Sequence, residues 1–79
     1  MRIILTDHAR ARIRERNINL KHVYAALASP DVLKPSSGNT IYVRKQISIR
    51  RAIIVIYKEY RTADRFISIL ITSYYHSSP

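Results

Sequence analysis

A chain of 79 residues without a cysteine is long enough for one domain with a thin hydrophobic core, and it has neither disulfides nor a cysteine-based zinc site. Fourteen Lys and Arg against five Asp and Glu give a formal net charge of +9, which favours an anionic partner. No stretch approaches the ~18–20 apolar residues of a membrane span, and the start lacks the apolar core of a secretory signal. We therefore expect a cytoplasmic protein that does not enter a membrane. We expect one domain over residues 1–79, with a frayed end over 76–79.

Arginine supplies most of the positive charge, since ten of the fourteen basic residues are Arg. The planar guanidinium matches phosphate with two parallel hydrogen bonds and can also stack on bases. This composition suits a site for a polyanion. The alternative is a well-solvated basic surface that keeps a small protein soluble.

The first segments predict a short strand and a helix. Residues 2–5 are apolar but long enough only for a brief edge strand. Thr6 is a good N-cap, and Asp7 places a negative charge in the first turn. These signals predict a helix from Asp7 to about Arg16, which Asn17 can end.

A second helix is predicted from residue 20 to about residue 28. Asn19 is its N-cap, and the Ser29-Pro30 pair stops it. Apolar side chains recur at helical spacing along this segment, which indicates a core-facing side; they are Leu20, Val23, Tyr24 and Leu27.

The rest of the chain has the alternating or β-branched character of strands. The predicted strands are 31–34, 40–47, 51–60 and 65–75. Their short connections favour antiparallel pairing, and helices that precede a sheet favour an α+β domain. We therefore expect two N-terminal helices followed by a three- or four-stranded antiparallel sheet, in two layers.

One face of this predicted sheet combines cations with tyrosines. Tyr42, Arg44 and Gln46 share a face, opposite to Ile41, Val43 and Ile47. The sequence does not determine the register of the strands, so either Tyr57 and Glu59 or Lys58 and Tyr60 join this face. The last strand contributes Ser68, Thr72 and Tyr74, which alternate with Ile67, Ile69 and Ile71. Such a face suits RNA, because cations hold phosphates and aromatic rings stack on unpaired bases. The alternative is the ordinary polar side of an antiparallel sheet.

The first predicted helix has a second polar grouping. His8, Ala11, Arg12 and Glu15 fall on one side of a helix. His8 and Arg12 are i,i+4 neighbours, and Arg12 and Glu15 are i,i+3 neighbours. The grouping suits either a salt-bridged surface or a cationic site with a histidine, the side chain that changes charge near neutral pH.

The sequence gives no sign of a metal or another cofactor. One glycine cannot make a Gly-rich phosphate loop, and five scattered carboxylates are too few for a two-metal nuclease centre. A ribonuclease without a metal needs a base for the 2′-hydroxyl, an acid for the leaving oxygen and cations for the developing charge. The chain contains all of these residue types.

Residues 6–18 read Thr-Asp-His-Ala-Arg-Ala-Arg-Ile-Arg-Glu-Arg-Asn-Ile. This string resembles the opening of a family of small bacterial and archaeal proteins of unknown function, in which the pattern is Ser/Thr-x-His-Ala-x-x-Arg-Ile/Met-x-Glu-Arg-x-Ile. Later stretches of the chain are similar to the family in the same order; they are residues 23–30, 34, 42–44, 53–57 and 69–74.

That family is similar to BrnT-like and RelE-like toxins of toxin–antitoxin systems. The resemblance implies a barnase- or RelE-like fold and a metal-independent endoribonuclease toxin that a cognate antitoxin neutralises. By position, His8, Arg12, Glu15 and Arg16 are the signature residues of the family, and Arg44 and Thr72 match weaker sheet positions. The similarity to RelE-like toxins implies catalytic groups on the sheet and near the C-terminus, where Tyr75 and His76 stand. The expected catalytic residues are therefore His8, Arg12, Glu15 and His76, and the expected RNA-binding residues are Arg16, Arg44, Lys58, Thr72 and Tyr74.

Two other functions remain open on the sequence. One is an RNA- or DNA-binding module without catalysis, and the other is an inactive toxin-like protein whose basic face binds an acidic antitoxin. The expected partners are RNA, including ribosome-associated message, and an antitoxin. A homodimer formed through exposed strand edges is also compatible with the sequence.

Overall fold

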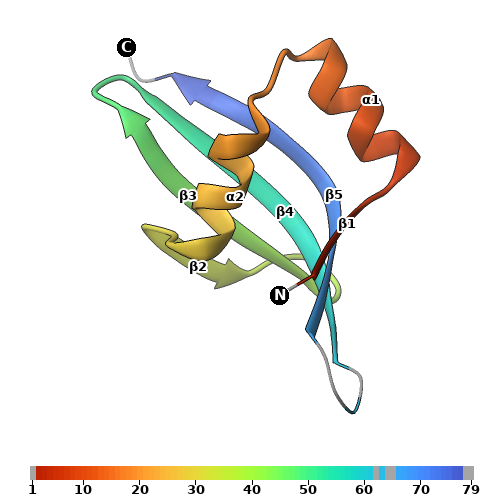
Figure 1. The fold of residues 1–79 in the computed structure, drawn as a ribbon. Coiled ribbons are helices and arrows are strands. Elements are labelled where there is room, and N and C mark those ends of the chain that lie inside the picture. The colour runs from red at the N-terminus through yellow and green to blue at the C-terminus, as the bar shows by residue number, and fades with distance from the viewer. Residues whose placement is uncertain (1, 62, 64–65, 78–79) are drawn as a thin grey trace.

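The computed structural model describes residues 2–61, 63 and 66–77. Two helices lie on one side of a single sheet (Figure 1). The elements in chain order are β1 (Arg2–Leu5), α1 (Asp7–Glu15), α2 (Leu20–Ala28), β2 (Val32–Pro35), β3 (Thr40–Ser48), β4 (Arg51–Arg61) and β5 (Phe66–Ser77).

Both predicted helices are confirmed, and both begin at the predicted caps. The side chain of Thr6 accepts a hydrogen bond from the backbone of Ala9 at 3.0 Å. The side chain of Asn19 accepts one from the backbone of Lys21 at 2.9 Å. Asn17 has a φ of 52°, in the left-handed region that Asn tolerates, and it ends the first helical segment as expected.

The sheet corrects the prediction of a three- or four-stranded antiparallel sheet. It has five strands in the order β1-β5-β4-β3-β2. The strands β2 to β5 pair in antiparallel fashion, but β1 pairs in parallel with β5, from Arg2 opposite Ile67 to Leu5 opposite Leu70. The class is α+β, but the sheet is mixed, and the antiparallel barnase- or RelE-like sheet implied by the resemblance is wrong for this chain. Residues 65 positions apart form the parallel pair, and local periodicity carries no information about such a distant partner.

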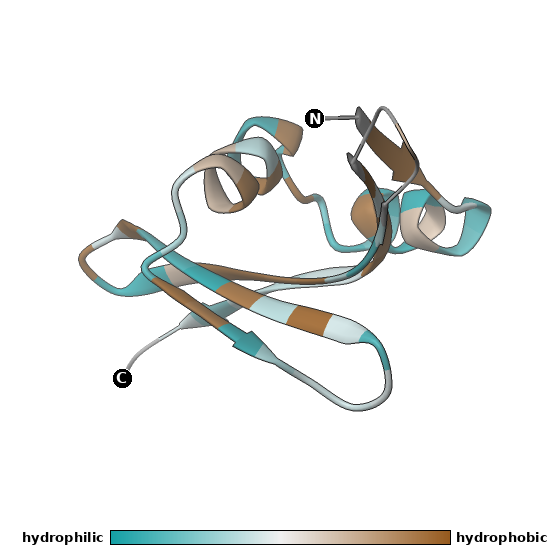
Figure 2. Cartoon of the chain, turned by 90° about the horizontal axis from the view of Figure 1, so that it is seen from below, coloured by the Kyte–Doolittle hydropathy of each residue, from teal (hydrophilic) through white to brown (hydrophobic). Residues whose placement is uncertain are grey.

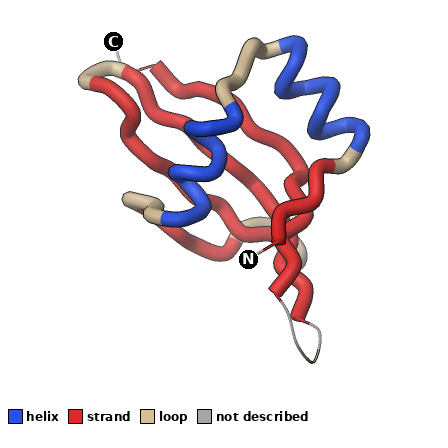
Figure 3. The backbone as a smooth tube through the Cα atoms, in the orientation of Figure 1, coloured by secondary structure: helices blue, strands red, loops and turns tan. Residues whose placement is uncertain are grey.

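Both helices cover the same face of the sheet (Figures 2 and 3), and the hydrophobic core lies between them and this face. The helix α1 packs on β5, and α2 packs on β3 and β4. Each fully buried Val, Leu or Ile contributes about 1.5–3 kcal/mol relative to an exposed side chain. The buried core residues are Ala9, Ile18, Val23, Ala26, Leu27, Val43, Ile53, Val55, Tyr57 and Leu70.

A β-bulge in β5 divides its polar residues between the two faces of the sheet. Ile56 pairs with Thr72 while Tyr57 pairs with Leu70, so Ile71 is an extra residue. The extra residue reverses the alternation, and Leu70 faces the core while Thr72 and Tyr74 face the other side. The prediction that Ser68, Thr72 and Tyr74 share one face is therefore wrong, because Ser68 lies on the core side with Leu70.

The outer edge of β5 is open beyond the bulge. Because β1 ends at Leu5, opposite Leu70, no strand of the described chain borders β5 from Ile71 to Ser77 on that side. The strand continues through His76 and Ser77, and residues 78 and 79 lie outside the described residues. The helix α1 runs beside this free edge (Figure 1).

Both helices are nine residues long, and within the described part of the chain no helix has the length and apolar character needed to cross a membrane.

Candidate functional site

The sheet face away from the helices, which we call the open face, carries cations and tyrosines. Residues directly opposite one another in paired strands share a face. One row across the sheet is therefore Lys34, Tyr42, Ile56 and Thr72; the next is Val32, Arg44, Ile54 and Tyr74; a third is Gln46, Ala52 and His76. This assignment confirms that Tyr42, Arg44 and Gln46 lie together, opposite the core residue Val43.

The charge on the open face has one sign. Lys34, Arg44 and Lys58 lie on it, and the described residues of β2 to β5 place no carboxylate there, because Glu59 pairs with Ser68 on the helix-covered side. The Nζ atom of Lys34 lies 4.9 Å from the ring centre of Tyr42, within the range of a cation–π contact. Of the two alternatives for β4, the pair Lys58 and Tyr60 joins this face.

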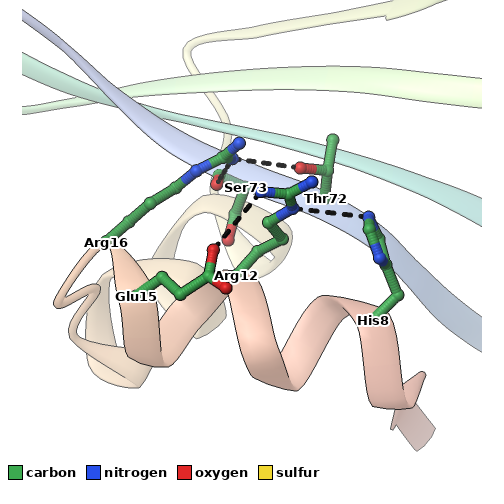
Figure 4. A network of polar contacts seen from close by, with 6 residues as sticks. All are labelled: His8, Arg12, Glu15, Arg16, Thr72 and Ser73. Carbon is green, nitrogen blue, oxygen red and sulfur yellow. Dashed lines mark hydrogen bonds and ion pairs between the residues drawn. The ribbon is translucent and has the colours of Figure 1, made fainter.

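A second polar group, which we call the α1 cluster, consists of His8, Arg12, Glu15, Arg16 and Thr72 (Figure 4). The Nε atom of Arg12 donates to Nε2 of His8 at 3.5 Å, and its Nη1 atom pairs with the Glu15 carboxylate at 3.3 Å. Positions three and four residues apart meet on one face of a helix, which explains these contacts. The structure thus brings all four predicted residues of the first helix together.

Arg16 joins this cluster to the sheet. Its Nη1 atom donates to Thr72 Oγ1 at 3.2 Å and to the backbone oxygen of Ser73 at 2.8 Å. The acceptors belong to the free edge of β5, where a backbone oxygen has no strand partner. A guanidinium has five N–H donors, so the other donors of Arg16 stay available to a ligand.

The ion pair on α1 is exposed and therefore weak. The side chains of Arg12 and Glu15 are 41% and 62% exposed, and an ion pair of this kind contributes only ~0.2–1 kcal/mol. A phosphate that approaches Arg12 can replace the carboxylate at little cost. The arrangement is thus a cationic, solvent-open site next to a histidine.

The other predicted site residues lie apart from the α1 cluster. Arg44, Lys58 and Tyr74 are on the open face. His76 lies on that face opposite Ala52, four residues beyond Thr72 and therefore about 13 Å along the strand. The structure does not bring His76 to His8.

The sequence reasoning missed one more polar group, at the far end of β5. The hydroxyl of Tyr75 lies 2.9 Å from Nδ1 of His22, and the guanidinium of Arg51 stacks 3.7 Å from the centre of the Tyr75 ring. These residues come from α2, β4 and β5, and no short motif links them. The sequence singles out Tyr75 only by its place near the C-terminus.

Among the described residues, no three or more His, Asp and Glu side chains lie close enough together to hold one metal ion.

Comparison with known proteins identifies the family but no activity. No curated protein and no solved structure gives a match. The model of a family described as a domain of unknown function (DUF4258) matches residues 5–75. The match spans the α1 cluster and extends to Tyr75, and it confirms the expected small family of unknown function. The chain therefore belongs to the DUF4258 family.

Proposed function

We propose that this protein is a metal-independent endoribonuclease of the toxin type, with the α1 cluster as its reacting site. The observation that carries the proposal is the gathering of one histidine and two arginines beside the free edge of β5, where Arg16 is bound to Thr72 and Ser73 and Arg12 to His8. Residues 6–18 resemble the opening of a family that is similar to BrnT-like and RelE-like toxins, and this resemblance supports the choice of RNA among polyanions.

In the proposed reaction the arginines hold the phosphate and His8 moves the proton. Arg12 and Arg16 donate to the non-bridging oxygens of one phosphodiester, where negative charge grows in the transition state. When Arg12 turns from His8 to the phosphate, Nε2 of His8 is free to take the proton of the 2′-hydroxyl. The oxygen of that hydroxyl forms a bond to phosphorus while the bond from phosphorus to the 5′-oxygen breaks. The leaving oxygen takes a proton from water, because the cluster is open to solvent. The products are a 2′,3′-cyclic phosphate and a 5′-hydroxyl.

Glu15, the other acid/base residue of the cluster, is paired with Arg12 and has no part in this reaction, which predicts a slow enzyme. A positioned acid or base contributes typically about 10²–10⁴-fold to a rate, and His76, the other expected candidate, lies on the open face. The toxin role then requires access to an RNA on which the cell depends, such as message held on a ribosome. It also predicts a cognate antitoxin that covers the basic surface.

The test compares variants of α1 and its C-cap, in which Arg16→Ala and its control lose the same charge. We expect His8→Ala and Arg16→Ala to lower the rate of RNA cleavage in EDTA by about 10²-fold or more, the usual loss for one transition-state donor. Arg14→Ala is the matched control, since Arg14 lies on the same helix, is exposed and has no part in the cluster. Equal rates for all three variants, on free and on ribosome-bound message, would exclude the α1 cluster as the reacting site.

A second candidate function is RNA binding without cleavage, through the open face. The observation in its favour is the set of three cations and three tyrosines on that face, to which the described residues of β2 to β5 add no carboxylate. It predicts that Arg44→Ala weakens RNA binding while Arg16→Ala does not. The opposite order supports the nuclease. An inactive relative that only binds an acidic antitoxin would bind neither free nor ribosomal RNA.

A further inference from the structure

The group at the far end of β5, formed by His22, Arg51 and Tyr75, has a defined hydrogen-bond arrangement. The Tyr75 oxygen accepts a hydrogen bond from the backbone N–H of Asn19 at 3.0 Å. The same oxygen lies 2.9 Å from Nδ1 of His22, and the two rings meet edge to face, with centres 5.8 Å apart. Tyr75 therefore orients His22 while it holds the start of α2 on the sheet.

The Tyr75 hydroxyl lies at the Nδ1 side of the His22 ring. When this hydroxyl donates to Nδ1 of the neutral imidazole, the ring proton resides on Nε2. A charged imidazole carries a proton on both nitrogens, so Nε2 is protonated in that form too. In these two forms Nε2 is a hydrogen-bond donor that can bind an anion, whereas the neutral ring with its proton on Nδ1 donates to the Tyr75 oxygen instead.

Arg51 offers further donors beside this nitrogen. Its guanidinium lies 3.7 Å from the centre of the Tyr75 ring, and the stacking holds its plane while its N–H edge stays open. Arg51 is exposed, and no ion pair involves it in the described part of the chain. His22 contacts the hydroxyl of Tyr75 and Arg51 lies over its ring, so the two donor groups are neighbours of one side chain.

The position along the sheet relates this group to the α1 cluster. Tyr75 and Ser73 both face the helix-covered side of β5, and Tyr75 is three residues beyond Thr72, or about 10 Å along the strand. Arg16 contacts the strand at Thr72 and Ser73. An extended nucleic-acid strand that follows the free edge of β5 would pass both groups.

We propose that His22 and Arg51, oriented by Tyr75, form a second phosphate-binding site that takes another phosphodiester of the same RNA strand. The proposal rests on the proposed nuclease function for the identity of the strand. The site offers two donors, and no described carboxylate forms an ion pair with them. It can therefore bind phosphate from any source.

The experiment measures binding of a 2′-O-methyl oligoribonucleotide, which lacks the nucleophile and cannot be cut. We expect Arg51→Ala to weaken binding about 10-fold and to reduce the slope of log affinity against log salt by about 0.7, the value for one phosphate contact on a single strand. Arg50→Ala is the matched control, because Arg50 is the exposed neighbour of Arg51 and no described residue pairs with it. It should change the affinity by less than about 2-fold.

A second variant and a second ligand complete the test. Tyr75→Phe keeps the ring under Arg51 but frees the His22 ring, and it should give a smaller loss than Arg51→Ala; thermal unfolding checks that each variant folds. Equal losses for Arg50→Ala and Arg51→Ala, or no loss for either, would overturn the site. Inorganic phosphate that binds as tightly as the oligonucleotide would overturn the RNA strand as its ligand. RNA that stays uncut by the wild type in EDTA refutes the nuclease alone, because the binding experiment needs no cleavage.

Discussion

Arg16 illustrates how one side chain can hold a site and still serve a ligand. Its contacts to Thr72 and to the Ser73 backbone use a single nitrogen. A lysine at this position would place one compact charge in reach of the same oxygens but would lose the planar fork that binds phosphate in two places. The residue is thus suited both to anchor α1 and to hold a scissile phosphate.

Tyr57 is a residue with a purely structural role, and it gives a prediction about stability and pH. Its side chain is only 6% exposed. Burial, and to a smaller extent the charge of Glu59, raises the pKa of the Tyr57 hydroxyl above its ordinary value of 10.0. The fold therefore favours the neutral phenol, and its contribution to stability is complete below pH 10 and is lost as the pH rises through the pKa of the folded state.

We expect the free energy of unfolding of the wild type to fall as the pH rises above the ordinary pKa of 10.0 and through the higher pKa of the folded state. The variant Tyr57→Phe should show a smaller fall, since it lacks the group that must ionise. Urea unfolding at several pH values measures both. Parallel curves for the two proteins would show that ionisation of Tyr57 does not govern the alkaline loss.

At the scale of the element, α1 is fixed to the sheet at both ends. Thr6 caps the helix and also donates from its hydroxyl to the backbone oxygen of Leu70 at 3.3 Å. Arg16 holds the other end to β5. The α1 cluster therefore has a stable position relative to the free strand edge, although every side chain in it has solvent access.

The variant Thr6→Ala should test this attachment. We expect it to lower the free energy of unfolding by about 1 kcal/mol, the typical cost of a lost N-cap. RNA cleavage should fall as well, because the position of His8 and Arg12 depends on α1. Thr6→Ser keeps the hydroxyl and should restore both stability and cleavage. A stable, fully active Thr6→Ala protein would mean that the cap does not position the site.

The elements also show what sequence patterns can and cannot predict. The helices were predictable because their caps, Thr6 and Asn19, act within a few residues. The parallel partner of β1 was not, since it lies at the other end of the chain. The bulge at Ile71 could not be predicted for a related reason. It arises from the pairing of β5 with β4, which the alternation of residues along β5 does not reveal.

At the scale of the whole molecule, some contacts of the candidate site could be predicted from the sequence and others could not. The contacts among His8, Arg12 and Glu15 follow from helical spacing and were predictable. The contact of Arg16 with Thr72 joins residues 56 positions apart, and that of His22 with Tyr75 joins residues 53 apart. Only the fold creates these pairs. The net charge of +9 indicated an anionic partner, and the fold distributes that charge over the open face and along the free edge of β5.

We propose that the α1 cluster cuts RNA without a metal, and the chemical groups at the ends of the RNA products are the best test of this proposal. Mass spectrometry of RNA incubated with the protein in EDTA should reveal fragments with 2′,3′-cyclic phosphate and 5′-hydroxyl ends, which are absent with His8→Ala. Intact RNA, both free and on ribosomes, would contradict the claim. So would fragments with 3′-hydroxyl and 5′-phosphate ends that form only when EDTA is left out.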